Sequence, residues 1–135
     1  MTDTISNEEL LKLATEARDH SYSPYSHYSV GAALLTKDGR VYQGCNIENA
    51  SFTPTICAER TAFFKAIYDG VHEFSAIAII GSGELPAFPC GVCRQVSLIH
   101  PEALHSQALR LNAKNGQKEY EKRYKSLHLM LKFSF

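Results

Sequence analysis

The chain reads Phe74-Ser75-Ala76-Ile77-Ala78-Ile79-Ile80 at its most apolar point, and Gly81-Ser82-Gly83 ends this stretch. A short, isoleucine-rich run without regular polar alternation is typical of a strand that is buried on both faces. We therefore expect residues 74–80 to form a strand of a central sheet that has helices on both sides.

The segments before this strand predict, in order, a helix over residues 7–19, a strand that begins at Val30, a returning strand over residues 41–44, and a helix over residues 58–67. Ser6 and Glu9 form a capping-box pair at the start of the first helix. Asp38-Gly39 suits a tight hairpin between the two strands, and Gly70 supplies a stop for the second helix.

The segments after the strand predict a helix over residues 90–99, a weak strand over residues 108–111, a turn at Asn115-Gly116 and a last helix over residues 121–131. His100-Pro101 ends the first of these helices. Helices and strands in this order predict an α/β domain with a central sheet covered on both faces.

The composition describes one compact domain, residues 1–135, with 14 Lys plus Arg and 14 Asp plus Glu and hence a formal net charge of zero. A chain of this length buries about two-thirds of its unfolded surface, so it needs no disulfides. Binding of duplex DNA or long RNA requires clustered positive charge, so a small, weakly charged ligand is expected instead.

The first nine residues are polar and acidic and have neither the basic start nor the apolar stretch of a secretory signal. The longest apolar run, Ala76 to Ile80, is far shorter than the roughly 20 residues that cross a bilayer. A cytoplasmic location is therefore expected, and no membrane partner. In that compartment thiols stay reduced, so the four cysteines indicate metal binding or catalysis.

Three of the cysteines lie in two stretches that each open a predicted helix, Thr55-Ile56-Cys57-Ala58-Glu59-Arg60 and Pro89-Cys90-Gly91-Val92-Cys93-Arg94-Gln95. The positive end of the helix dipole favours the thiolate, which is the metal-binding form. We expect Cys57, Cys90 and Cys93 to hold Zn²⁺ and to leave a fourth position for water, as catalytic zinc sites do.

Glu59 follows Cys57 by two residues, so its carboxylate is expected beside the metal without being a ligand, where it can carry protons. Backbone N–H groups near Ala58 and Cys90, at the helix starts, are expected to hold polar groups of the substrate. Arg60, Arg94 and Gln95 are candidates to lie beside the ligands, where a guanidinium would moderate the negative charge of three thiolates.

Other interpretations of the cysteines stay open. Cys90 and Cys93 have the spacing of a redox pair, and Cys45 would complete a structural site with four cysteines. We expect Cys45 instead to be a small buried apolar residue at the end of the second strand. The six histidines are expected on the surface or in loops.

Asn46 and Glu48 lie two residues apart at the end of that strand, so their side chains are expected to point the same way. Together they offer hydrogen-bond donors and acceptors for one or two sugar hydroxyls. An ordinary Asn-rich turn is the alternative interpretation.

Taken together, the chain resembles the small cytidine deaminase family that acts on free nucleosides. Besides the two cysteine stretches, the resemblance is carried by Tyr22-Ser23-Pro24-Tyr25-Ser26, Val30-Gly31-Ala32-Ala33-Leu34-Leu35 and Gly44-Cys45-Asn46-Ile47-Glu48-Asn49-Ala50. It implies a three-layer α/β/α cytidine deaminase-like fold with a central mixed sheet, one Zn²⁺ per subunit, and Glu59 as proton shuttle.

The resemblance also implies site residues and an assembly. It places Asn46 and Glu48 on the ribose hydroxyls, Tyr28 beside the base, and Phe135 against the pyrimidine of a neighbour in a homotetramer whose subunits complete one another's sites. Lys132 stands where the family pattern has a proline.

The function implied is hydrolytic deamination of cytidine and 2′-deoxycytidine to the uridines plus ammonia, in pyrimidine salvage. A related cytosine nucleoside or a nucleoside antibiotic is an alternative substrate. A polynucleotide-editing deaminase is disfavoured by the balanced charge. From another class, a non-catalytic, zinc-stabilised nucleoside-binding scaffold also stays open.

Overall fold

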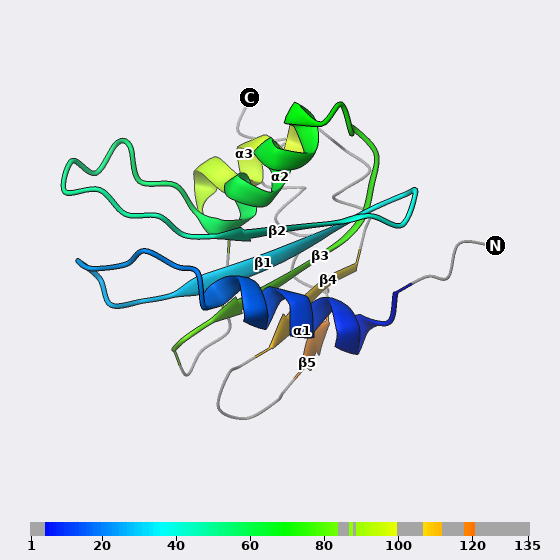
Figure 1. The fold of residues 1–135 in the computed structure, drawn as a ribbon, viewed down its shortest axis with the longest axis horizontal. Helices are drawn as coiled ribbons and strands as arrows, with labels where there is room; N and C mark the ends of the chain where they lie inside the picture. Colours follow the sequence, from blue (N-terminus) through cyan, green and yellow to red (C-terminus); the bar gives the residue numbers. More distant parts are fainter. Residues whose placement is uncertain (1–4, 84–86, 88, 100–106, 112–117, 121–135) are drawn as a thin grey trace.

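The computed structural model describes residues 5–83, 87, 89–99, 107–111 and 118–120. Its elements are α1 (Asn7–Arg18), β1 (Val30–Thr36), β2 (Val41–Cys45), α2 (Ala58–Tyr68), β3 (Phe74–Gly81), α3 (Gly91–Ile99), β4 (Gln107–Leu111) and β5 (Lys118–Tyr120). The strands form one mixed sheet in the order β2-β1-β3-β4-β5 (Figure 1). Only the β3–β4 pair is parallel among these neighbours, and the other pairs are antiparallel.

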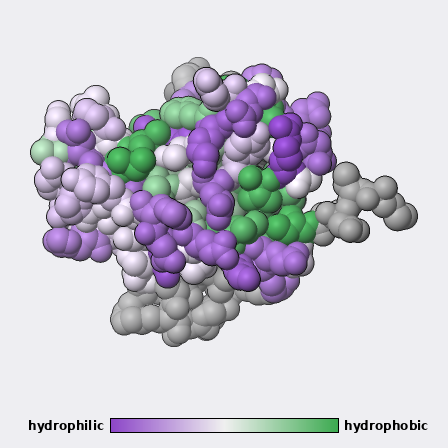
Figure 2. Space-filling model, in the orientation of Figure 1, coloured by the Kyte–Doolittle hydropathy of each residue, from purple (hydrophilic) through white to green (hydrophobic). Residues whose placement is uncertain are grey.

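The capping box at the start of α1 is present. Glu9 N–H donates to Ser6 Oγ at 3.2 Å, and the Glu9 carboxylate accepts from Ser6 N–H at 3.0 Å. These two bonds satisfy backbone donors that the first helical turn leaves without partners. The apolar face of α1 lies inward through Leu10, Leu11 and Ala14. Figure 2 shows a mainly hydrophilic surface on the side of the molecule where α1 lies.

Strand β3 is buried on both faces, as its sequence predicts. Ala76, Ala78 and Ile80 pack with α1 in one apolar cluster. Ile77 and Ile79 point to the opposite face and pack with α2 in a second cluster, to which α3 contributes Val96. Figure 1 shows α1 on one side of the sheet and α2 with α3 on the other. The predicted three layers are therefore confirmed.

The hairpin between β1 and β2 has the predicted turn. Thr36 N–H donates to Arg40 O at 2.8 Å, and residues 37–40 connect the strands. Within this connection Gly39 has a φ of 88°, a left-handed conformation that glycine adopts without steric cost.

Strand β5 is not among the elements that the sequence predicts. It is only three residues long, Lys118, Glu119 and Tyr120, and its polar composition carries no strand signal. It forms by antiparallel pairing with β4, which tertiary structure supplies. The predicted turn at Asn115-Gly116 and the predicted helix over residues 121–131 lie outside the described residues. Within the described part of the chain, no helix has the length and apolar character needed to cross a membrane.

A close backbone contact brings α2 onto β2 at Gly44. A Cβ atom there would lie 2.3 Å from Ala58 O and 2.6 Å from Ala62 N, distances at which atoms overlap. Only glycine allows this approach. Cys57, the N-cap residue of α2, is thereby held beside the end of β2.

We predict that Gly44→Ala lowers the free energy of unfolding by about 3 kcal/mol, because backbone atoms of α2 must move to admit the methyl group. Urea denaturation followed by circular dichroism measures the change. Gly39→Asn is the control, since nothing lies within 4 Å of a Cβ at Gly39 and asparagine tolerates a left-handed φ. Equal stability of Gly44→Ala and the wild type would contradict the close approach.

Candidate metal centre and active site

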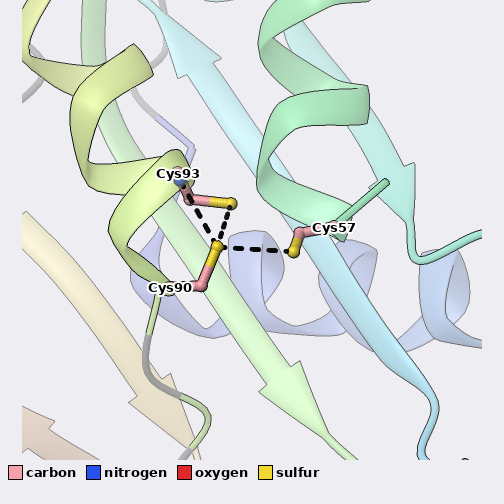
Figure 3. Close-up of side chains that lie close together, drawn as sticks. All are labelled: Cys57, Cys90 and Cys93. Atoms are coloured by element: carbon pink, nitrogen blue, oxygen red, sulfur yellow. Dashed lines mark hydrogen bonds between the residues drawn. The ribbon is translucent and has the colours of Figure 1, made fainter. Parts of the chain in front are cut away.

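Three cysteine side chains converge where α2 and α3 begin (Figure 3). Cys57 is the N-cap residue of α2, Cys90 immediately precedes α3, and Cys93 lies in the first turn of α3. The Sγ atoms of Cys57 and Cys90 are 3.7 Å apart, those of Cys90 and Cys93 are 3.6 Å apart, and all three lie within 4.8 Å of one another.

These distances fit a zinc ion. A tetrahedral site with Zn–S bonds of about 2.3 Å sets neighbouring sulfurs about 3.8 Å apart. The described residues offer three sulfur ligands, which is the number that leaves one tetrahedral position for a reactant. The predicted ligand set Cys57, Cys90 and Cys93 is thus brought together at metal-binding distance.

The environment of the three sulfurs favours one thiolate. Hydrogen bonding from Cys93 and from Arg60 lowers the pKa of Cys57 to about 5. The same contact with Cys57, together with burial, raises the pKa of Cys93 above its ordinary value. Arg60 Nη2 donates to Cys57 Sγ at 3.5 Å, so a cation already faces the sulfur that carries the negative charge.

Glu59 is buried beside the cysteines, with 5% of its surface exposed. Burial raises the pKa of Glu59 to about 7, and the negative charge of Cys57 acts in the same direction. Cys93 Sγ lies 3.8 Å from Glu59 Oε2 and donates to it. A carboxyl group with this pKa can take up and release a proton near neutral pH, as a general acid–base group must.

The three polar residues proposed to lie near the ligands differ in position. Arg60 contacts Cys57, and its Nε is buried without a hydrogen-bond partner among the described residues. Arg94 Nε donates to Pro89 O at 3.2 Å and so steadies the residue before Cys90. The side chain of Gln95 is exposed, and its role beside the zinc ligands stays a prediction.

A cavity of about 380 Å³ opens in front of the cysteines. It is lined by Ser26, Tyr28, Val30, Asn46, Glu48, Thr55, Ile56, Cys57, Ala58, Glu59, Ala87 and Cys90. The same cavity is therefore bordered by Glu59 and by all the predicted substrate residues that the structure describes, namely Tyr28, Asn46, Glu48 and Ala58. Phe135 lies outside the described residues.

The side chain of Asn46 is held by groups of the loop before β1 and by the first residue of β1. Asn46 Oδ1 accepts from Val30 N–H at 2.9 Å and from Ser21 Oγ. Asn46 Nδ2 donates to Tyr28 O at 2.7 Å. These contacts fix the orientation of the amide, and the sequence pattern at residues 44–50 gives no sign of them.

The carboxylate of Glu48 is held by the same loop. Its Oε1 accepts from the N–H groups of Tyr25 and Ser26, each at 3.1 Å. Its Oε2 accepts from Ser26 Oγ at 2.5 Å. Hydrogen bonds from Ser26 lower the pKa of Glu48, so it stays a carboxylate. Ser26 is a site residue that sequence reasoning missed, although it lies in a motif, Ser23-Pro24-Tyr25-Ser26, that the family resemblance includes.

Tyr28 forms one wall of the cavity and is 36% exposed. Its ring lies against two glycines, since a Cβ at Gly81 would lie 2.1 Å from Tyr28 Oη and one at Gly83 would lie 3.0 Å from Tyr28 Cε2. Burial, and secondarily the charge of Glu59, raises the pKa of the Tyr28 hydroxyl, which stays protonated.

Cys45 is separate from the metal-binding cluster. It lines a different cavity, together with His20 and Lys65, and its Sγ donates to His20 O at 3.4 Å. Cys45 is half-buried, so the prediction of a buried residue is wrong in degree: the strand end leaves one side of the thiol open to this cavity. Burial raises the pKa of Cys45. His20, His27 and His72 are exposed, as predicted, and the other histidines lie outside the described residues.

Comparison with known proteins finds relatives that are similar over about two-thirds of this chain. The chain is 55% identical over 89 residues to a cytidine deaminase of Sporosarcina psychrophila, an alignment that covers 66% of this chain and 65% of the relative. It is 55% identical over 87 residues to a cytidine deaminase of Halalkalibacterium halodurans, covering 64% of this chain and 66% of the relative. The chain thus matches slightly less than two-thirds of the length of these relatives.

Solved structures agree over a longer part of the chain. The crystal structure of cytidine deaminase from Burkholderia pseudomallei matches with a TM-score of 0.80 and 42% identity, and covers 87% of this chain and 92% of that chain. Cytidine deaminase from Mycobacterium tuberculosis matches with a TM-score of 0.73 and 32% identity, and covers 91% of this chain and 94% of that chain.

A family model described as the cytidine and deoxycytidylate deaminase zinc-binding region matches residues 4–101, which include all three clustered cysteines and Glu59. The matched region contains α1, β1, β2, α2, β3 and α3, the elements that build the cavity and the metal centre. The chain therefore belongs to the zinc-binding cytidine and deoxycytidylate deaminase family.

Proposed function

We propose that this chain is a zinc-dependent hydrolase that deaminates cytidine and 2′-deoxycytidine to uridine and 2′-deoxyuridine with release of ammonia. The observation that carries the proposal is the position of Glu59, a buried carboxyl group between three metal-binding sulfurs and a cavity lined by Asn46 and Glu48. Residues 1–135 form a single deaminase-like domain in this proposal. A cytosolic location fits, because a thiolate site requires reduced cysteines.

Cys57, Cys90 and Cys93 would hold the zinc ion, which would act as a Lewis acid and lower the pKa of the water that attacks C4 of the pyrimidine. The protein's own part is proton transfer. Glu59 takes one proton from that water and delivers it to N3 of the base. Glu59 then takes the second proton, from the hydroxyl now bonded to C4, and passes it to the amino group, so that the C4–N bond breaks, ammonia leaves and a carbonyl forms at C4. Its low exposure keeps competing solvent away from this exchange. Backbone N–H groups at the start of α2, near Ala58, are available to hold substrate oxygen.

The hydrogen bonds already made by Asn46 and Glu48 leave one donor and one acceptor for a substrate. Asn46 carries two amide hydrogens, and one is donated to Tyr28 O. The Glu48 carboxylate has about four acceptor positions, of which three are used by Tyr25 and Ser26. A single sugar hydroxyl that accepts from Asn46 and donates to Glu48 satisfies both. This supports a nucleoside, rather than a free base, as the substrate.

We predict that the wild-type protein loaded with zinc releases ammonia from cytidine and 2′-deoxycytidine but much less from free cytosine and none from adenosine. Glu59→Gln should lower kcat by about a thousandfold, since a positioned acid–base group contributes 10²–10⁴-fold. Coupled ammonia assays measure the rate, and metal analysis checks that Glu59→Gln retains zinc. A folded, zinc-loaded wild type without activity on any of these nucleosides would refute the proposal and favour a binding scaffold.

Zinc content provides a second prediction. We expect one zinc ion per chain, and we expect Cys90→Ala to lower zinc affinity by about a hundredfold or more, because four ligands together contribute about 10 kcal/mol or more in zinc sites. Competition with a chromogenic chelator measures the affinity. Cys45→Ala is the matched control, since Cys45 lies outside the cluster and should keep full zinc content. Loss of zinc in Cys45→Ala would instead indicate a fourth cysteine ligand.

We also propose a homotetramer in which neighbouring subunits, through Phe135, complete each site. Support comes from large apolar side chains exposed near the cavity, Phe52 at 88% and Tyr22 and Tyr25 at 57% each. Exposed aromatic residues of this kind are typical of association surfaces.

Sedimentation equilibrium of the wild type should therefore give the mass of four chains. Phe52→Ala should weaken assembly. Tyr68→Ala is the control, because it also removes an exposed aromatic side chain, at the end of α2, and so reports the effect of losing apolar surface in general. A wild type that sediments as a single chain at micromolar concentration would exclude the tetramer.

A further inference from the structure

We infer that Ser26 is a positioning residue that holds both the carboxylate of Glu48 and the backbone of Tyr28 in place at the cavity. The inference rests on the proposed function, because it assigns to Glu48 and Tyr28 the binding of a nucleoside. It adds a residue that no sequence pattern marks for this role.

The hydroxyl of Ser26 makes two different hydrogen bonds. It donates to Glu48 Oε2 at 2.5 Å and accepts from Tyr28 N–H at 3.1 Å. A serine hydroxyl has one hydrogen to donate, and here that hydrogen is used on the carboxylate. The backbone N–H of Ser26 donates to Glu48 Oε1 at 3.1 Å, so the same residue contacts both carboxylate oxygens.

The backbone conformation of His27 makes this pair of contacts possible. His27 has a φ of 55°, the only positive φ of a non-glycine residue in the described part of the chain. Its N–H donates to Ser23 O at 3.1 Å, which closes the turn. A left-handed residue reverses the chain direction, so the amide of Tyr28 turns back toward the hydroxyl of Ser26. Such a conformation is uncommon for histidine and persists where surrounding contacts support it.

The other side of Tyr28 is held by Asn46. Asn46 Nδ2 donates to Tyr28 O at 2.7 Å, so the N–H and the C=O of Tyr28 are bound by Ser26 and Asn46 respectively. A continuous set of hydrogen bonds thus runs from Glu48 through Ser26 and Tyr28 to Asn46. It links the two residues proposed for the sugar with the residue proposed for the base.

Positioning of this kind affects substrate binding rather than the chemical step. Glutamate has several rotamers, and the loss of rotamer freedom opposes binding unless the side chain is already held. When Ser26 loses its hydroxyl, Glu48 Oε1 keeps two backbone contacts while Oε2 loses its partner. The carboxylate can then rotate away from the substrate hydroxyl. Glu59 and the cysteines are not touched by this change.

The experiment compares wild type, Ser26→Ala, Ser26→Thr and Thr15→Val. Ser26 is exposed, so its truncation removes no buried packing. Thr15 provides the matched control, because its hydroxyl donates to Leu11 O within α1, on the other face of the sheet. Steady-state kinetics are measured with cytidine and with 2′,3′-dideoxycytidine. Amide hydrogen exchange of Tyr28 is measured by NMR on the same zinc-loaded proteins.

We expect Ser26→Ala to raise KM for cytidine about tenfold with kcat changed less than twofold, and to lower kcat/KM for 2′,3′-dideoxycytidine clearly less than for cytidine, because only the contact through Tyr28 is weakened for that substrate. The Tyr28 amide should exchange about tenfold faster in Ser26→Ala. Ser26→Thr, which keeps the hydroxyl, should restore both values to within about threefold. Thr15→Val should match the wild type in kinetics and in Tyr28 exchange.

Unchanged cytidine KM and unchanged Tyr28 exchange in Ser26→Ala would overturn the inference while leaving the proposed deaminase activity intact. Equal losses on cytidine and 2′,3′-dideoxycytidine would also overturn it, because they indicate a general disturbance of the loop. If the wild type releases no ammonia, the proposed function fails separately. In that case the role of Ser26 is tested without catalysis. Calorimetry compares the affinity of wild type and of Ser26→Ala for uridine, and NMR compares their rates of Tyr28 amide exchange.

Discussion

The convergence of three sulfur atoms on one point is the constraint on which the rest of this structure depends. Three thiolates at separations of 3.6 and 3.7 Å would repel one another, so full deprotonation of the cluster requires two helices that begin side by side and a cation that joins the sulfurs. Two helices can begin side by side there because α2 and α3 share one face of the sheet. The glycine at position 44 lets α2 approach closely enough for this.

Charge at the cavity differs from the charge of the whole chain. The sequence is formally neutral, yet the cavity and its metal centre gather the sulfurs, Glu48 and Glu59. Among the residues that the structure describes, Arg60 is a cation that contacts this group, through Cys57. Burial keeps Glu59 partly protonated near neutral pH, and hydrogen bonds keep Glu48 ionised. Two carboxyl groups in one cavity therefore differ in protonation because one is desolvated and the other is hydrogen-bonded.

Local patterns predicted the elements from α1 to α3 and the metal ligands, because capping boxes, apolar periodicity and cysteine spacing act over a few residues. Strand β5 was missed, since three polar residues become a strand only through pairing with β4. The sequence also marked Asn46 and Glu48 as polar residues facing a substrate, but not their partners Val30, Tyr25 and Ser26. Those contacts join residues far apart in the chain, and no local pattern encodes them.

The contact between Tyr28 and the glycines at the end of β3 has an evolutionary consequence. A side chain at position 81 would occupy the space of the tyrosine hydroxyl, so the two positions cannot change independently. In a lineage that gains a side chain at 81, position 28 must first take a shorter residue, and the wall of the cavity would recede with it. The width of the cavity on this side is therefore set jointly by two positions, 28 just before β1 and 81 at the end of β3, rather than by either one alone.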